Sequence, residues 1–282
     1  MKNIQGFTLI ETMISLVIFG IVMAGIYQTY DSQQATYIKQ QQVIDMQQNQ
    51  RTAIYFLGQE IRMTGYDPTG NADMIPGTTT IDTPGLLVAD IAELTMTQDL
   101  NGDGDITEDD NELLRYALDK DCDENRDGIS DAITKGSSWV NNGDECNLIR
   151  ENIELSASGV ADANGEQPVA NDMDAIELLY ILDDGTVTSK PANDEERAQV
   201  RSIIISTLVR TRNRIANYRN TNTYIPASNA RDDDDEYVIL DSRLIGTRPG
   251  VWGPFDDPYR RNLYVTRLKC RNLGRNPYAD IR

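Results

Sequence analysis

The chain has 282 residues, with 45 acidic and 26 basic side chains, a formal net charge of −19, three cysteines and no histidine. Without histidine it can form neither a Ser-His-Asp or Cys-His catalytic system nor a histidine-ligated zinc or haem site. The acidic excess also argues against binding nucleic acid through a broad basic surface.

The first predicted element is an apolar segment near the amino terminus. Residues 7–27 read FTLIETMISLVIFGIVMAGIY, and about 20 apolar residues suffice to cross a hydrocarbon core roughly 30 Å thick. Lys2 is the only charge before this segment, so the positive-inside rule leaves the amino terminus in the cytoplasm and exports the remainder. The residues after the segment contain no Ala-x-Ala cleavage site. The small residue at which the chain could be cleaved, Gly6, lies before the segment. We therefore expect a single pass through a membrane.

One acidic residue, Glu11, lies within this apolar segment. A carboxylate on a membrane helix costs roughly 2.5–3.5 kcal/mol on insertion scales and usually marks a function or a partner. Two interpretations remain open: Glu11 extends to the cytoplasmic interface, or it pairs with a positive charge from another chain.

The helix is predicted to continue well beyond the apolar segment. Residues 28–64 contain no proline and a single glycine, Gly58, and Ile54, Leu57 and Ile61 recur at helical spacing. We expect one helix over residues 7–64, whose amphipathic second half, 28–64, lies against a globular head formed by residues 65–282. Gly65-Tyr66-Asp67-Pro68 ends the helix.

The head is predicted to be rich in short strands that acidic insertions interrupt. Each candidate strand has aliphatic or tyrosine content and is bounded by Gly, Pro, Asn or Asp. The predicted fold class is α+β, with an antiparallel sheet wrapped on the second half of the long helix. The candidate strands are residues 91–97, 113–118, 147–153, 175–182, 202–209, 236–240 and 263–270.

The first eleven residues, MKNIQGFTLIE, resemble the class III leader of type IV prepilins and type II secretion pseudopilins. The resemblance implies that a prepilin peptidase cuts after Gly6, removes residues 1–6 as a leader, and methylates Phe7. It also implies that Glu11 pairs with the amino group of a neighbouring subunit during assembly. A desolvated ammonium and carboxylate favour each other, whereas either one alone is penalised.

The head is similar, more loosely, to PilW-type minor pilins and J-type pseudopilins, in the succession LRYALD at 114–119, LIR at 148–150 and AIELLY at 175–180. This resemblance implies a non-enzymatic minor subunit at or near the tip of a type IV pilus. Before assembly it would span the inner membrane once, with its head in the periplasm, and after assembly it would be exposed at the cell surface. Its implied partners are other minor and major pilins and a tip adhesin. The alternatives are a J-type pseudopilin of type II secretion and a membrane-anchored, calcium-dependent adhesin or binding module.

A first acidic loop, residues 99–110, follows the spacing of an EF-hand calcium loop. Glycine stands at the sixth position (Gly104) and an aliphatic residue at the eighth (Ile106), as that loop requires. The alternative is an acidic hairpin turn, because Asp-Gly pairs favour tight turns in any case. The candidate calcium ligands are Asp99, Asn101, Asp103, Asp105 and Asp110.

A second acidic loop, residues 121–146, repeats the Asp-x-Asn-x-Asp-Gly pattern, with a spacing that resembles thrombospondin type 3 repeats. Its candidate ligands are Asp123, Asn125, Asp127 and Asp131. Here calcium and a solvated loop remain equal alternatives. The acidic run at residues 232–236 lacks the alternation and the glycine, so a solvated loop is expected there.

Two cysteines, Cys122 and Cys146, enclose most of the second acidic loop. Because an exported head lies in an oxidising compartment, this pair is expected to form a disulfide, which contributes roughly 3 kcal/mol in the chain-entropy model. Cys270 would then be free. Pairings of Cys270 with either of the other two cysteines remain open on sequence grounds.

Overall fold

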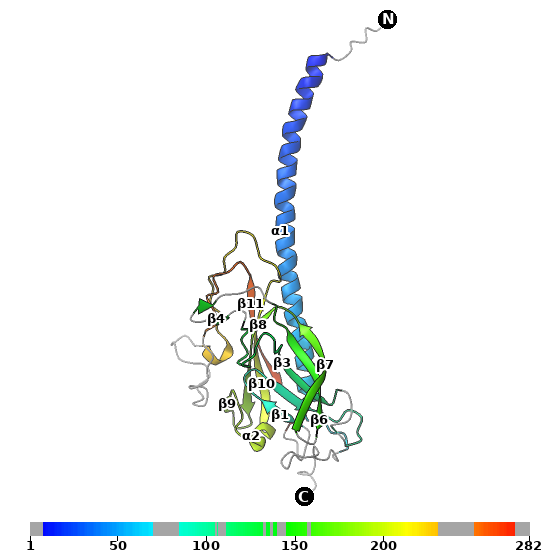
Figure 1. Ribbon diagram of the computed structural model, residues 1–282, viewed down its shortest axis with the longest axis vertical. Helices are drawn as coiled ribbons and strands as arrows, with labels where there is room; N and C mark the ends of the chain where they lie inside the picture. Colours follow the sequence, from blue (N-terminus) through cyan, green and yellow to red (C-terminus); the bar gives the residue numbers. More distant parts are fainter. Residues whose placement is uncertain are drawn as a thin grey trace. The chain divides into compact units, whose positions relative to one another are not determined.

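A computed structural model of the protein describes residues 8–69, 85–104, 106, 111–131, 134–135, 138–139, 145–156, 159–230 and 251–273 (Figure 1). The chain divides into two compact units, Met1–Ile44 and Asp45–Arg282. The first unit is the amino-terminal part of one long helix, α1, which spans Leu9–Met63. The second unit, the head, contains the rest of α1 and all the strands. The helix expected over residues 7–64 is confirmed from Leu9 to Met63, and the boundary between the two compact units falls within it, after Ile44.

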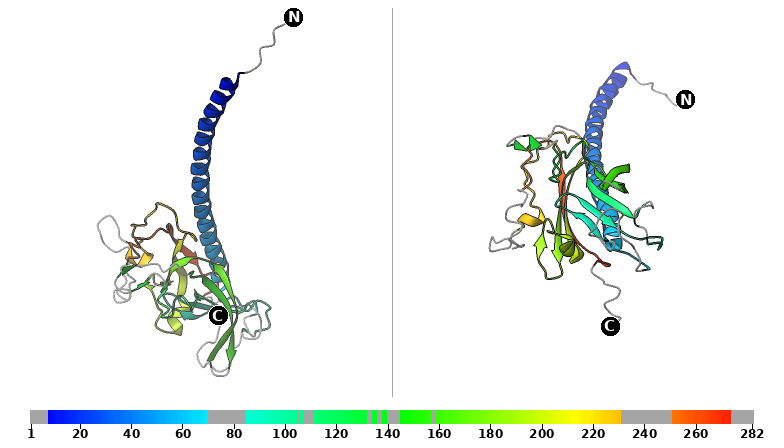
Figure 2. Two further views of the ribbon diagram at one scale, coloured as in Figure 1. Left: turned by 45° about the horizontal axis from the view of Figure 1, so that its top comes forward. Right: turned by 60° about the horizontal axis from the view of Figure 1, so that its bottom comes forward.

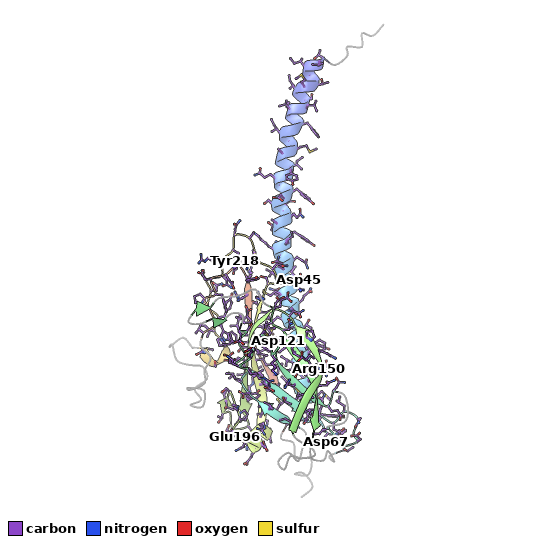
Figure 3. The ribbon with its side chains drawn as sticks, in the orientation of Figure 1. Asp45, Asp67, Asp121, Arg150, Glu196 and Tyr218 are labelled. Carbon is purple, nitrogen blue, oxygen red and sulfur yellow. A yellow bond between two sulfur atoms is a disulfide. The ribbon has the colours of Figure 1, made fainter. Side chains whose placement is uncertain are left out.

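Within the first unit, the apolar side chains of α1 are exposed. Leu9 is 77% accessible and Leu16 is 68% accessible, and Figure 3 shows side chains that project on both flanks of this half of the helix. Among the described residues, α1 alone is long and apolar enough to cross a membrane, and no part of its apolar window is buried in the protein.

Within the head, α1 becomes a helix with one buried face. Ala53, Leu57 and Ile61 recur every four residues, and all three are fully buried. Residues at this spacing share one side of a helix. The helix ends at Met63, after which Gly65 adopts a positive φ of 76° and donates its N–H to Thr97 O (2.9 Å).

The strands form two main antiparallel sheets, not the single sheet expected from the sequence. The first sheet has the order β1-β2-β3-β6-β7, and the second has the order β11-β10-β8-β9. Strands β4 and β5 make a separate two-stranded ribbon. The bounds are β1 Leu86–Ala89, β2 Leu94–Thr97, β3 Leu113–Leu118, β4 Thr134–Lys135, β5 Ser138–Trp139, β6 Leu148–Ser156, β7 Gly159–Ala170, β8 Met173–Leu182, β9 Val187–Thr188, β10 Val200–Arg210 and β11 Arg261–Lys269, with the short helices α2 Asp194–Ala198 and η1 Ala227–Asn229.

The second half of α1 contacts both sheets through polar side chains as well as its apolar face. Gln50 donates to Thr207 O (3.2 Å) on β10 and to Asn262 O (3.1 Å) on β11. Glu60 forms an ion pair with Arg150 (2.8 Å) on β6 of the first sheet. Figure 2 shows the strands gathered around this part of the helix. The helix therefore bonds to both sheets, which also bond to each other where Leu178 N–H on β8 donates to Ile91 O (2.8 Å) in the turn between β1 and β2.

Most of the expected strands are present, and the exceptions have physical reasons. The strand expected at 91–97 begins only at Leu94, because Asp90 N–H bonds to Glu93 O (2.9 Å) in a turn after β1. The strand expected at 236–240 lies outside the described residues. Strand β7 was not predicted, because its residues include Pro168 and two glycines and lack an apolar alternation. It is an edge strand, the position in which a sheet tolerates proline.

Candidate functional site

The amino terminus of α1 holds the first candidate site. Gly6 and Phe7, the residues expected to be cleaved and methylated, lie outside the described residues. Glu11 is in the first turn of α1, and its Oε2 accepts hydrogen bonds from Thr8 N–H and from Thr8 Oγ1, both at 2.9 Å. Glu11 N–H donates in return to Thr8 Oγ1 at 3.4 Å. This reciprocal pair is a capping box, which satisfies backbone donors that a helix start leaves unpaired.

The capping box gives Glu11 a local role that was not predicted from the sequence. The Thr-x-x-Glu spacing of Thr8 and Glu11 is the signal that could have predicted it. A carboxylate offers about four acceptor positions, so two donors from Thr8 leave capacity for a further cation. The side chain also lies at the positive end of the helix, where a negative charge is favourable. Glu11 can therefore cap its own helix and still accept an ammonium group from outside.

The first acidic loop is built around a carboxylate that points inward. Asp99 is fully buried, and its two oxygens accept the N–H groups of Gly102 (2.6 Å) and Gly104 (3.2 Å). Gly104 has a φ of +87°, which disfavours any side chain at this position. Asn101 and Asp103 bond to each other through side chain and backbone, each at 2.8 Å. The remaining candidate ligands, Asp105 and Asp110, lie outside the described residues.

Glu112, two residues beyond the first acidic loop, also holds this loop in place and was not predicted. Its side chain is buried, and its Oε1 accepts the N–H groups of Leu100 (2.7 Å) and Asn101 (3.3 Å). The only signal in the sequence is an acid directly before the apolar strand β3. The loop is thus anchored from two sides, by Asp99 and by Glu112.

The second acidic loop adopts the same turn as the first. The carboxylate of Asp123 accepts the N–H groups of Asp127 (3.1 Å) and Gly128 (3.0 Å), and Asn125 Oδ1 accepts the N–H of Asp127 (2.9 Å). A Cβ on Gly128 would lie 2.3 Å from Ile176 O on β8, so only glycine fits at that contact. Asp131, the fourth candidate ligand, accepts the N–H of Glu124 (2.8 Å).

Two carboxylates of the second acidic loop, Asp123 and Asp127, are disfavoured in their charged form by burial. Burial raises the pKa of Asp123 to about 6, the nearby charges of Asp127 and Asp131 add to the increase, and the N–H of Gly128 opposes it. Burial likewise raises the pKa of Asp127. Even so, in the described part of the chain no three His, Cys, Asp or Glu side chains lie close enough together to hold a metal ion. Calcium at either loop therefore remains a prediction.

The cysteines take the expected arrangement. Cys122 and Cys146 form a disulfide with a Cα–Cα distance of 5.5 Å, which closes the second acidic loop. Cys270 follows β11 as a free, buried thiol. Burial raises the pKa of Cys270 to about 12, so this thiol is protonated at neutral pH.

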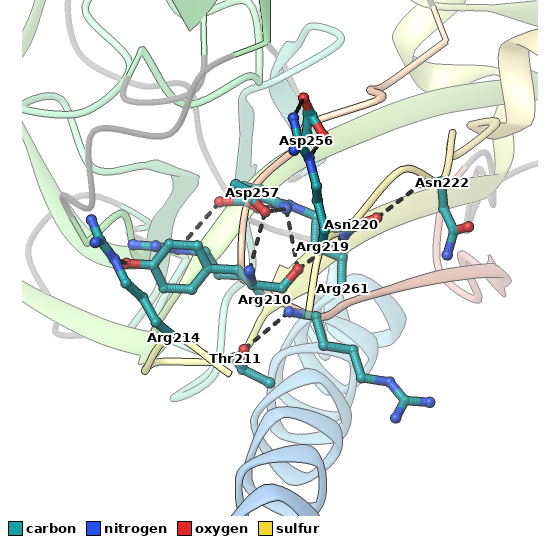
Figure 4. Close-up of polar contacts among 12 residues, drawn as sticks. Arg210, Thr211, Arg214, Arg219, Asn220, Asn222, Asp256, Asp257 and Arg261 are labelled. Atoms are coloured by element: carbon teal, nitrogen blue, oxygen red, sulfur yellow. Dashed lines mark hydrogen bonds and ion pairs between the residues drawn. The ribbon is translucent and has the colours of Figure 1, made fainter. Parts of the chain in front are cut away.

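A buried cluster of arginines and aspartates, absent from the sequence predictions, ties the second sheet to the segment before β11 (Figure 4). Asp174 on β8 forms ion pairs with Arg210 on β10 (3.4 Å) and with Arg261 on β11. Arg261 also donates twice to Asp257 (2.6 and 2.7 Å) and stacks over the ring of Phe255 at 3.7 Å. Because opposite charges are matched within the cluster, we interpret it as structural.

Comparison with known proteins identifies the amino-terminal segment. The family model for the prokaryotic N-terminal methylation motif matches residues 1–27, which include Gly6, Phe7, Glu11 and the apolar segment. The structure is also similar to that of a type IV-like pilin from Thermus thermophilus. The two chains are 14% identical, with a TM-score of 0.40, and the match covers 80% of this chain and 96% of the other. No curated protein matches the sequence.

Proposed function

We propose that this protein is a minor subunit of a type IV pilus or a related pseudopilus, with a role in assembly and no catalytic one. The observation that carries the proposal is the methylation motif at residues 1–27. The motif leads into a helix whose first half exposes its apolar side chains. An apolar helix of this length needs a membrane before assembly and other apolar helices after it. The motif supports cleavage after Gly6 and methylation of Phe7 by a prepilin peptidase.

The finer assignment is a PilW-type minor pilin at or near the filament tip, with other minor and major pilins, and a tip adhesin, as partners. It is supported by the loops of the head, which would crowd neighbours in a repeating shaft. The alternative, a J-type pseudopilin of type II secretion, shares the same leader, helix and head type. Immunogold labelling separates the tip from the shaft: labels at filament ends support the tip assignment, and even labelling along the filament contradicts it.

The mass of the amino-terminal peptide, from native membranes or sheared filaments, tests the proposal first. A peptide that begins at methylated Phe7 supports it, and an intact start at Met1 contradicts it. Gly6→Asp should retain the leader and abolish incorporation into filaments. A simple membrane anchor would be indifferent to this change.

The capping box allows the charge of Glu11 to be tested separately from its structural role. Glutamine at this position of a capping box still bonds to the helix start, so Glu11→Gln removes the charge and keeps the cap. Thr8→Ala removes the cap and keeps the charge. If Glu11 pairs with a neighbouring subunit, only Glu11→Gln should strongly reduce incorporation into filaments. Equal losses in both variants would assign Glu11 a capping role alone.

A second candidate function, calcium binding by the acidic loops, is favoured by one specific observation. Two separate Asp-x-Asn-x-Asp-Gly segments adopt the same turn, with the first carboxylate bonded to the glycine N–H in each (Asp99 to Gly104, Asp123 to Gly128). If this turn holds calcium, EDTA should lower the melting temperature of the full-length protein in detergent, and Asp103→Ala should remove the part of that response that comes from the first loop. Glu195→Ala, an exposed acid outside both loops, is the control. Identical melting temperatures of the wild type with calcium and with EDTA would show that the loops are acidic turns that do not bind calcium.

A further inference from the structure

The outer edge of β11 is a row of backbone groups directed away from the sheet. Its pairing with β10 is unbroken from Arg210↔Arg261 to Ser202↔Lys269. In this register Cys270 N–H bonds to Arg201 O (3.0 Å) and Thr211 N–H bonds to Arg260 O (2.8 Å). Since bonded and non-bonded pairs alternate in an antiparallel ladder, the even-numbered residues of β11 bond to β10. The odd-numbered residues direct N–H and C=O outward.

Among the described residues, no strand pairs with this outer edge. Leu263, Val265, Arg267 and Lys269 therefore present their backbone groups along seven residues of strand, which is long enough to template another strand. Val265 is 44% exposed, as expected for an edge without a cover. Within the described part of the chain, this edge therefore has no partner strand and could pair with a further extended segment.

A groove of about 510 Å³ runs beside this edge, between β11 and the second half of α1. Its apolar walls come from Ile54 and Tyr55 on the helix and from Tyr264 and Leu268 on the strand. Tyr55 is 67% exposed. Side chains of an added strand would alternate between this groove and the opposite face of the sheet.

The charge around this edge is opposite in sign to the charge of the whole chain. Arg51 and Arg62 line the groove from the helix, and Arg267 and Lys269 stand on the other face of β11, followed by Arg271. Within the described residues, no carboxylate forms an ion pair with any of these five cations, although the chain carries 45 acidic residues. Unpaired cations on both faces of an open strand edge favour an acidic partner.

We propose that the outer edge of β11 binds an acidic, extended polypeptide segment of another protein chain, which adds to the second sheet as a further antiparallel or parallel strand. Backbone hydrogen bonds to residues 263–269 would hold the segment in register, as in other cases of strand addition. Its apolar side chains would enter the groove at Tyr55 and Leu268. Its carboxylates would meet Arg267 and Lys269 on one face and Arg51 and Arg62 at the rim of the groove. The proposal stands on the head alone and does not depend on processing of the leader.

A labelled peptide tests this proposal directly. The probe is a ten-residue peptide that alternates glutamate with valine or threonine, and its control replaces every glutamate with lysine. Fluorescence anisotropy with the full-length protein in neutral detergent should detect binding of the acidic peptide only, and added salt should weaken it. Arg267→Glu with Lys269→Glu should raise the Kd by roughly tenfold or more. Lys120→Glu with Arg214→Glu changes the net charge equally at exposed sites that do not line the groove, and it should leave the Kd within about twofold.

Strand addition is distinguished from simple charge attraction by Val265→Pro. This change removes an outward N–H without breaking a bond to β10, and edge strands accept proline, so it should raise the Kd by roughly fivefold or more. In the wild-type protein, the peptide should also slow amide hydrogen exchange in residues 263–269. No binding, or equal loss in both double variants, would overturn the proposal. Binding without slower exchange in β11 would overturn strand addition.

Discussion

The two halves of α1 are one continuous helix with opposite surroundings. In the first half, Leu9 and Leu16 are 77% and 68% exposed, whereas in the second half Leu57 and Ile61 are completely buried by the head. Helix formation needs only local backbone bonds and suitable residues, so both halves form it. Burial needs partners, and among the described residues only those of the second half have them. The first half is therefore the surface that a membrane or other subunits must cover.

The largest expected effect on stability comes from truncating a leucine in the buried half of α1, in comparison with a leucine in the exposed half. Leu57→Ala should lower the free energy of unfolding of the head by about 2–5 kcal/mol, because it removes a fully buried side chain and leaves a cavity. Leu16→Ala is the matched control in the other half, and it should change that free energy by less than about 0.5 kcal/mol. Chemical denaturation of the full-length protein in detergent measures both. Equal effects would show that the first half also supports the head.

A pH series tests whether burial also controls the polar groups of the head. Glu177 on β8 is buried, and burial raises the pKa of its carboxyl despite hydrogen bonds from Ser228 and Ser206. Because the folded state holds this proton more tightly than the unfolded state does, ionisation of Glu177 costs stability as the pH rises above the ordinary carboxyl pKa of about 4.3. The stability of Glu177→Gln relative to wild type should therefore increase from pH 4 to pH 8. A difference independent of pH would contradict the role of burial.

A smaller effect is expected at the exposed start of the helix. Thr8→Ala removes the side-chain partner of Glu11 and should destabilise the first turn by about 1 kcal/mol, or roughly fivefold in amide exchange of residues 11–14, the first amides that are hydrogen-bonded. The head should unfold at an unchanged denaturant concentration, since the cap and the head are distant along the helix. A shift in head unfolding would mean that the two halves are energetically coupled.

The smallest expected effect on stability is that of a labelling experiment, which compares the reaction rates of a buried and an exposed thiol. Cys270 is buried, and its pKa is raised to about 12, so iodoacetamide should not label it in the folded protein at neutral pH. A cysteine placed at the exposed position Ser32 of the first half should be labelled within minutes under the same conditions. Mass spectrometry reports both reactions, and labelling of Cys270 in denaturant confirms that the thiol is free. Rapid labelling of Cys270 in the folded state would show that the end of β11 opens.

Much of the fold follows from local patterns in the sequence. The helix was predictable because residues 9–63 lack proline and carry apolar residues at helical spacing in their second half. Strands β3, β8 and β10 were predictable because each is a compact aliphatic run. Strand β7 and the division into two sheets were not, because β7 is held by its pairing with β6 and not by its own composition. The disulfide between Cys122 and Cys146 was also predictable, because the two cysteines flank one loop and are close along the chain.

The candidate sites divide in the same way. Gly6, Phe7 and Glu11 belong to a contiguous motif, so eleven residues in order were enough to predict their roles. The turns at Asp99 and Asp123 were likewise readable from glycine spacing. Glu112, the cluster around Arg261 and Asp174, and the open edge of β11 unite residues far apart in the chain. Only the folded structure could bring them together.

By itself, the sequence determined what depends on neighbours along the chain: the methylation motif, the long helix, the acidic turns and the identity of most strands. The tertiary structure decided which half of α1 is buried, which carboxylates are held inside the head, and which strand edge faces cations without a partner strand. The physical reason is that helix propensity, turn geometry and peptidase recognition act over a few residues. Burial, sheet order and charge complementarity arise only when distant segments pack against one another.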